Sequence, residues 1–129
     1  MPAYIVSVVE VTNPGPNFKK YTEESARLAR SHGGKYLIRG KSANVVSGTL
    51  LEKKALIILE FPGMENLRAF YDSDAYQKDC KPLREGTGIY DIAFVRKDAL
   101  GPGLLHTVLG EIGHSLLIPK TLMRAEPKS

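Results

Sequence analysis

Ionisable side chains occupy positions of this sequence where the hydrophobic pattern calls for apolar residues. Arg39 ends a predicted strand, Glu60 shares a strand face with apolar neighbours, and His32 falls on the apolar side of a predicted helix. A guanidinium group can hold a carboxylate or an enolate, and a histidine or a carboxylate can move a proton. The pattern predicts a cleft between a sheet and its helices, with these three side chains as the catalytic groups.

Further polar residues are predicted to complete this cleft as substrate-binding groups. Tyr21, Tyr71 and Tyr76 lie on the inward faces of predicted helices, where their rings would form walls. Arg84 would help Arg39 to hold an anion. Asp91, on an otherwise apolar strand, is the last member of the predicted site.

A purely structural role explains the same charged residues equally well. Buried charges are costly unless they are paired. Arg39 would then form an ion pair with Glu60 or with Asp91 and contribute to the fold alone. The sequence supports both interpretations.

Neither a metal nor a cofactor is predicted. The three histidines form no HxxxH or HExxH pair, and no cysteine or carboxylate completes a ligand set at a recognised spacing. The glycines at 86 and 88 precede a strand rather than a helix, so they lack the form of a phosphate-binding loop. Cys80, the one cysteine, is expected to be a small core or interface residue.

Composition indicates one globular domain. The chain has 129 residues, of which 43% are hydrophobic and 25% charged, with a net charge of +4. The basic residues are scattered, so no nucleic-acid partner is expected. Because no apolar run reaches a membrane span and no signal peptide is seen, no membrane contact is expected. A lone cysteine fits a reducing compartment, and a cytoplasmic location is therefore predicted.

The order of predicted elements is β-α-β-β-α-β. Strands are predicted at residues 4–12, 35–39 with a continuation at 44–47, 55–61 and 89–96. Helices are predicted from Asn13 or Asn17 to His32, and from Met64 to Arg84 with a restart at Ser73 and a kink at Pro82. This order predicts an α+β, ferredoxin-like domain over residues 1–97, with two helices on one face of a four-stranded antiparallel sheet.

Both faces of the predicted sheet are apolar. A sheet with one solvated face should alternate apolar and polar residues, and strands 4–12, 55–61 and 89–96 do not. Two helices cover only one face, so the other is expected to pack on a second copy across a two-fold axis. The tail, residues 98–129, is expected to dock on this body or on the partner subunit.

Three stretches of the chain resemble a known family: PAYIVSVVEVTNP at the start, HGGKYLIRG at 32–40 and LEFPGMENLRAFYDSDAYQ at 59–77. They are similar to the uncharacterised domain-of-unknown-function family numbered thirteen-thirty, of the dimeric α/β-barrel superfamily, over about residues 2–97. The resemblance implies the same fold and homodimer, and it implies no established reaction. The family's recurrent polar positions, as matched here, are His32, Arg39, Glu60, Ser73, Tyr76 and Arg84.

These observations together predict a homodimer that binds a small anionic or aromatic metabolite without a cofactor. Two forms of this function remain open: a cofactor-independent enzyme of proton-transfer or oxygenation type, or a non-catalytic ligand-binding or interaction module. RNA binding through the sheet is not expected, because the strand ALIILEF offers Phe61 alone where RNA-binding sheets display paired aromatic residues.

Overall fold

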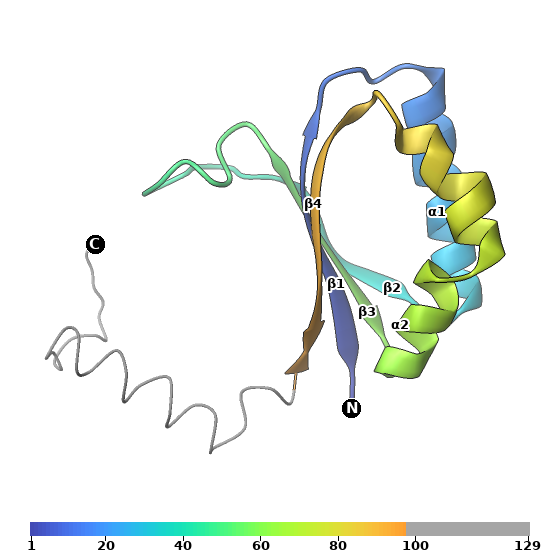
Figure 1. Cartoon of the computed structure of the whole chain (residues 1–129). Coiled ribbons are helices and arrows are strands. Elements are labelled where there is room, and N and C mark those ends of the chain that lie inside the picture. Colours follow the sequence, from blue (N-terminus) through green and yellow to red (C-terminus); the bar gives the residue numbers. More distant parts are fainter. Residues whose placement is uncertain (98–129) are drawn as a thin grey trace, which may run out of the picture. The chain divides into compact units, whose positions relative to one another are not determined.

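The computed structural model describes residues 1–97, which form an α+β domain with a ferredoxin-like fold (Figure 1). The predicted order of elements is confirmed, with the second helix divided into three pieces. In chain order they are β1 (Ala3–Val11), α1 (Pro16–Ser31), β2 (Lys35–Lys41), β3 (Ala55–Phe61), α2 (Met64–Tyr71), a π-helix η1 (Ala75–Cys80), a 3₁₀ helix η2 (Lys81–Arg84) and β4 (Gly88–Arg96).

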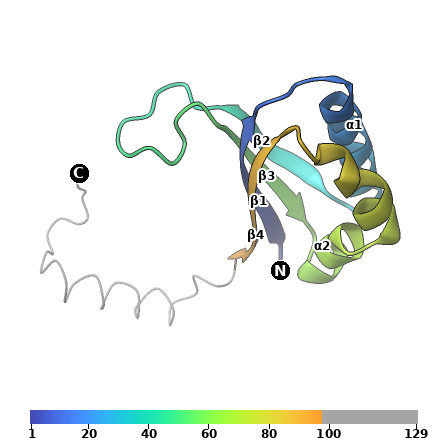
Figure 2. The same ribbon diagram turned by 45° about the horizontal axis from the view of Figure 1, so that its top comes forward.

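The four strands form one antiparallel sheet in the order β2-β3-β1-β4, and all the helices cover a single face of it (Figures 1 and 2). The register places Ile5 of the central strand β1 between Leu59 of β3 and Phe94 of β4. Residues directly opposite each other on neighbouring strands point to the same face of the sheet. Ile5 and Leu59 are buried, so this face is the one that the helices cover.

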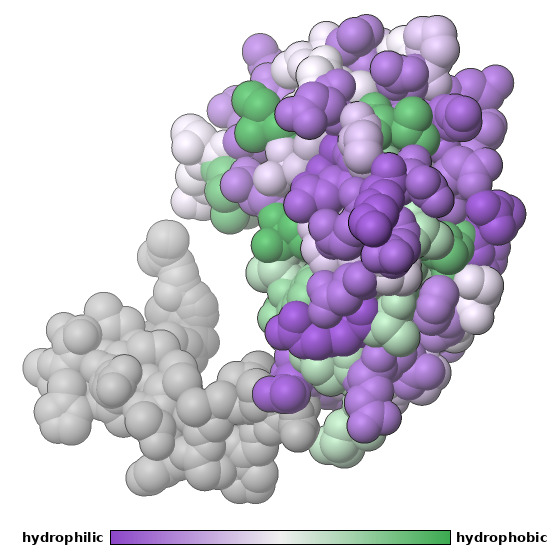
Figure 3. Space-filling model, turned by 45° about the vertical axis from the view of Figure 1, so that its right-hand side comes forward, coloured by the Kyte–Doolittle hydropathy of each residue, from purple (hydrophilic) through white to green (hydrophobic). Residues whose placement is uncertain are grey.

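The core lies between the sheet and the helices. Its largest fully buried side chains are Phe61 of β3, Leu67 of α2 and Tyr76 of η1. Ala29 of α1 is also fully buried and belongs to the same cluster. The opposite side of the helices is mainly hydrophilic, as Figure 3 shows with that side turned forward. The apolar residues of the helices are therefore directed at the sheet.

The other face of the sheet carries no helix of residues 1–97 (Figure 1). Val6 of β1 stands there between Ile58 of β3 and Ala93 of β4. In the next row Val8 stands between Leu56 and Asp91. The register therefore places apolar side chains at the centre of both faces, and we call this second one the outer face.

The ends of α1 follow from a proline and a glycine. Pro16 occupies the first turn after Gly15, so a start at Asn13 with Pro14 in the first turn is wrong. Proline suits this position because its missing N–H would have no partner there. At the other end Gly33 has φ of 86°, the left-handed conformation that closes a helix and that glycine adopts without strain. The predicted end of the helix is confirmed.

The strand predicted at residues 44–47 is wrong. β2 runs without a break through Gly40 to Lys41, and its irregularity lies between Tyr36 and Ile38 instead. Residues 42–54 then form an irregular segment, which we call the arm. It projects beyond the sheet on the side away from the helices (Figure 1). No strand of residues 1–97 pairs with this segment to accept its hydrogen bonds, and Val46 is 89% exposed.

The predicted restart at Ser73 is confirmed. The Ser73 hydroxyl accepts a hydrogen bond from the Tyr76 backbone N–H at 3.0 Å and donates one to the Phe70 carbonyl at 2.7 Å. The π-helix η1 then gives way to the 3₁₀ turn η2, which begins at Lys81 and has Pro82, a residue without an N–H, in its first turn. None of the helices described is long and apolar enough to cross a membrane. The predicted tail, residues 98–129, lies outside the described residues.

Candidate functional site

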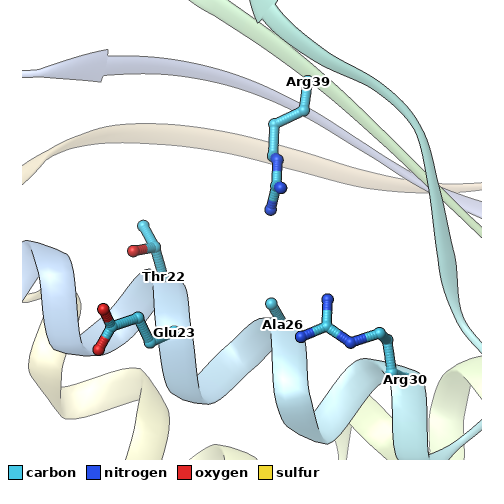
Figure 4. Close-up of a pocket in the computed structure, with 5 residues that line it drawn as sticks. All are labelled: Thr22, Glu23, Ala26, Arg30 and Arg39. Carbon is cyan, nitrogen blue, oxygen red and sulfur yellow. The ribbon is translucent and has the colours of Figure 1, made fainter.

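A groove of about 510 Å³ lies between α1 and the edge strand β2 (Figure 4). Thr22, Ala26 and Arg30 line it from α1, where a spacing of four places them on one side of the helix. Arg39 reaches toward α1 from β2, and Glu23 completes the lining. Thr22 and Ala26 are small, so they leave space between the helix and the strand. We call this site the α1–β2 groove.

Two guanidinium groups dominate the charge of the α1–β2 groove. Neither Arg30 nor Arg39 forms a salt bridge with any carboxylate of residues 1–97. The register places Arg39 and Tyr36 on the helical side of the sheet, where the Arg39 guanidinium carbon lies 4.2 Å from the ring centre of Tyr36 in a cation–π contact. The groove therefore presents positive charge with free hydrogen-bond donors.

The three residues predicted to be catalytic are not brought together. Arg39 stands opposite Ile57 on the helical side, whereas Glu60, three residues further along β3, is on the outer face. There Glu60 accepts a hydrogen bond from the Tyr4 hydroxyl at 3.1 Å and lies 3.6 Å from the Lys35 ammonium group. The ion pair of Arg39 with Glu60 is therefore not formed, because the sheet separates the two side chains.

His32 and Asp91 also lie away from the groove. His32 is the residue that ends α1, where its Nδ1 lies 3.0 Å from the Leu28 carbonyl oxygen and its ring packs near Phe70. Asp91 is exposed on the outer face of β4, opposite Val8, so it does not pair with Arg39 either. The contacts of His32 are those of a helix end.

The predicted substrate-binding residues Tyr21, Tyr71, Tyr76 and Arg84 do come together. The hydroxyl groups of Tyr21 and Tyr76 are 2.6 Å apart, and Arg84 Nη1 donates to the Tyr76 oxygen at 3.1 Å. The ring of Tyr71 lies 4.6 Å from that of Tyr76. Four separate elements thus contribute to one buried cluster, which we call the tyrosine cluster.

Burial controls the ionisation of the tyrosine cluster. Desolvation raises the pKa of both Tyr76 and Tyr21, and the positive charge of Arg84 opposes the rise at each. Both phenols are therefore neutral at physiological pH. Tyr76 is only 2% exposed, so the interactions of its hydroxyl group are internal to the fold. They connect η1 to α1 and to η2.

Sequence reasoning missed members of both sites. Arg30 falls among the charged residues of α1, and only the position of β2 reveals that its side chain meets a groove. Tyr90 and Thr87 were missed beside the tyrosine cluster: the Tyr90 ring lies 6.0 Å from that of Tyr21, and its hydroxyl is 2.7 Å from the Thr87 hydroxyl. The alternation of inward and outward residues along β4 could have placed Tyr90 on the helical face of the sheet.

A further cavity, of about 350 Å³, lies between α1 and η1 and has Cys80 in its lining. The Cys80 side chain is 3% exposed, and burial raises the pKa of its thiol. Because the thiolate is the reactive form, we expect native Cys80 to react with a disulfide reagent at least about tenfold more slowly than in urea. Equal rates in absorbance-monitored labelling of native and unfolded protein would contradict this burial.

Comparison with models of protein families shows to which family the chain belongs. Residues 2–98 match the model described as Domain of unknown function (DUF1330). The chain belongs to the DUF1330 family. The resemblance seen in the sequence is therefore confirmed, and the family carries no established reaction. Among curated proteins no match is found.

Solved structures similar to this DUF1330 protein are also uncharacterised. One is the RPA0582 protein of unknown function from Rhodopseudomonas palustris, with a TM-score of 0.59 and 14% identity over 73% of this chain and 80% of that one. A structure of methylated RPA0582 protein has a TM-score of 0.58 and 15% identity, covering 79% and 83% of the two chains. At these identities the likeness supports the fold alone.

A metal site is not found within residues 1–97, where no three histidine, cysteine, aspartate or glutamate side chains gather. The other two histidines, His106 and His114, lie outside the described residues.

Proposed function

We propose that this DUF1330 protein binds a small anionic metabolite in the α1–β2 groove. The observation that carries the proposal is that Arg30 and Arg39 line one cavity from two elements and have no carboxylate partner within residues 1–97. A reducing compartment such as the cytoplasm is proposed with it, because Cys80 is a free thiol. The proposal is limited to binding, since the residues predicted to be catalytic lie apart.

The chemistry of the groove favours a carboxylate on a small body. A guanidinium group presents its N–H donors in a planar fork that matches a carboxylate. The volume of about 510 Å³ is in the range of small-molecule sites, and the methyl group of Ala26 offers an apolar contact between the polar ends. Neither arginine has to leave a salt bridge within the described part of the chain before it can hold a ligand.

Removing either guanidinium group should weaken binding of a carboxylate probe. We expect Arg39→Gln and Arg30→Gln each to reduce the affinity for hexanoate about five- to tenfold, because a charge-assisted hydrogen bond contributes on the order of 1 kcal/mol in an open site. Ligand-observed NMR measures this. Arg68→Gln is the control, since Arg68 lies 3.7 Å from Asp72 and outside the groove. A loss in the control equal to that in Arg39→Gln would contradict the assignment.

We further propose that the protein is a homodimer through the outer face. The central row of this face is apolar, with Val6 between Ile58 and Ala93, and the helices of residues 1–97 cover the opposite side. The arm projects on the same side as the outer face (Figure 1) and carries Val46 and Leu50, both largely exposed. A second copy offers an identical apolar face, so one two-fold axis would cover both.

A charge at the centre of the outer face should separate the copies. We expect Val6→Lys to change the solution mass from that of two chains to that of one, because each copy would then bury an ammonium group in the apolar interface. Light scattering coupled to size exclusion measures the mass. Glu65→Lys, on the exposed side of α2, is the control and should stay dimeric. Wild-type protein with the mass of one chain would overturn the proposal.

A further inference from the structure

We propose that the ligand of the α1–β2 groove is bipolar and carries a cationic amine as well as its anionic group. This inference rests on the anion-binding function proposed above. The lining of the groove includes one carboxylate, that of Glu23, besides the guanidinium groups of Arg30 and Arg39. A ligand with a carboxylate alone would satisfy only part of this lining.

Opposite charges are separated along the helix axis. Glu23 and Arg30 are seven residues apart on α1, which corresponds to about 10 Å along the axis. Figure 4 shows Glu23 at the end of the groove near Thr22 and Arg30 at the other end, with Ala26 between them and Arg39 above. The groove thus has an acidic end and a basic end, with a methyl group in the middle.

Glu23 is available for such a ligand. Its neighbour Glu24 is the residue that pairs with Arg27, and that pair lines the separate cavity between α1 and η1. For Glu23 no salt bridge is formed with any basic group of residues 1–97. The negative charge of Glu23 would repel a second anionic group on the ligand and attract a cationic one. An ammonium group is therefore the expected ligand group at this end of the groove.

The chemical class is therefore an ω-amino carboxylate. Its carboxylate would lie between Arg30 and Arg39, its methylene chain over Ala26, and its amine at Glu23. The specificity comes from the amine, since a plain fatty acid of the same length would leave the Glu23 carboxylate without a charged partner.

The test compares 6-aminohexanoate with hexanoate on wild-type protein and on Glu23→Gln. Wild-type protein should bind the amino compound about three- to fivefold more tightly, as expected for one ion pair in an open groove. Glu23→Gln should lose this preference, chiefly because it binds 6-aminohexanoate more weakly. Glu24→Gln is the matched control one residue away, and it should retain the preference.

The outcomes separate the two proposals. Hexanoate bound as tightly as 6-aminohexanoate by wild-type protein, or a preference that persists in Glu23→Gln, overturns the bipolar ligand and leaves anion binding in place. Binding of neither compound overturns anion binding in the groove, and the bipolar ligand with it. A preference lost in Glu24→Gln as well as in Glu23→Gln would assign the effect to the general charge of α1 and also overturn the inference.

Discussion

Gly88→Ala should destabilise the protein by about 3 kcal/mol or more, the upper end of what overpacking costs. Gly88 begins β4 and stands opposite Val11 of β1. A Cβ atom there would overlap the Glu10 carbonyl oxygen and lie 3.2 Å from the Val11 Cα. Both are backbone atoms, so the contact can be relieved only by moving the two strands apart. The pairing of β1 with β4 would then be weakened at this end.

Urea unfolding followed by circular dichroism measures this loss as a lower transition midpoint. Gly40→Ala is the matched control, because Gly40 is also in a strand and no atom lies within 4 Å of its added Cβ. We expect the control to stay within about 0.5 kcal/mol of wild type. Equal midpoints for the two variants would mean that β1 and β4 are not packed as closely as described.

Tyr76→Ala should cost about 3–5 kcal/mol, the range found when a large buried aromatic side chain is removed. The ring is buried against Phe70 and Tyr71, and its hydroxyl joins Tyr21 of α1 to Arg84 of η2. Tyr76→Phe isolates the hydroxyl and should cost about 1–3 kcal/mol, because Arg84 and Tyr21 would each lose a partner in the core.

The control for the hydroxyl is Tyr36→Phe, again measured by urea unfolding. Tyr36 is half-buried on β2, and its hydroxyl forms no side-chain hydrogen bond within the described range of 1–97. Its substitution should change the free energy of unfolding by less than about 0.5 kcal/mol. A Tyr76→Phe variant as stable as this control would show that the cluster contributes only packing.

The same cluster predicts the response to alkaline pH. Burial raises the pKa of Tyr76 and Tyr21 above the ordinary phenol value, so the folded protein keeps protons that the unfolded chain releases near pH 10. The stability from this difference is complete below pH 10 and falls as pH rises above it, by up to about 1.4 kcal/mol per pH unit for each phenol. The fall should be shallower in Tyr76→Phe, and an unchanged slope would contradict the burial.

The fold could be predicted because its signals are local. Alternation and apolar runs locate the four strands, glycine closes α1 at Gly33, and Pro82 marks the final 3₁₀ turn before the loop to β4. The errors arose where the conformation of a segment depends on its contacts with other segments of the chain. Residues 44–47 have strand-like composition, but within residues 1–97 no strand pairs with them. At the start of α1 the sequence has two prolines, and the helix begins at the second, Pro16.

The candidate site was predicted only in part, because it depends on register. The inward spacing of Tyr21, Tyr71 and Tyr76 was visible in the sequence, and these residues do meet. Arg39 and Glu60 were both recognised as polar intrusions, but the pairing of β2 with β3 determines that they face opposite sides of the sheet. A strand reverses the direction of its side chains at each residue, so a shift of one position decides which charges can meet.

One measurement tests anion binding in the α1–β2 groove most directly: a titration of isotope-labelled protein with hexanoate, followed through the backbone amide signals. The proposal predicts that the shifts gather at Thr22, Ala26 and Arg39, and that they saturate in the millimolar range expected of a small fragment. Shifts that gather instead around Cys80, in the cavity between α1 and η1, or no shifts at all, would contradict it.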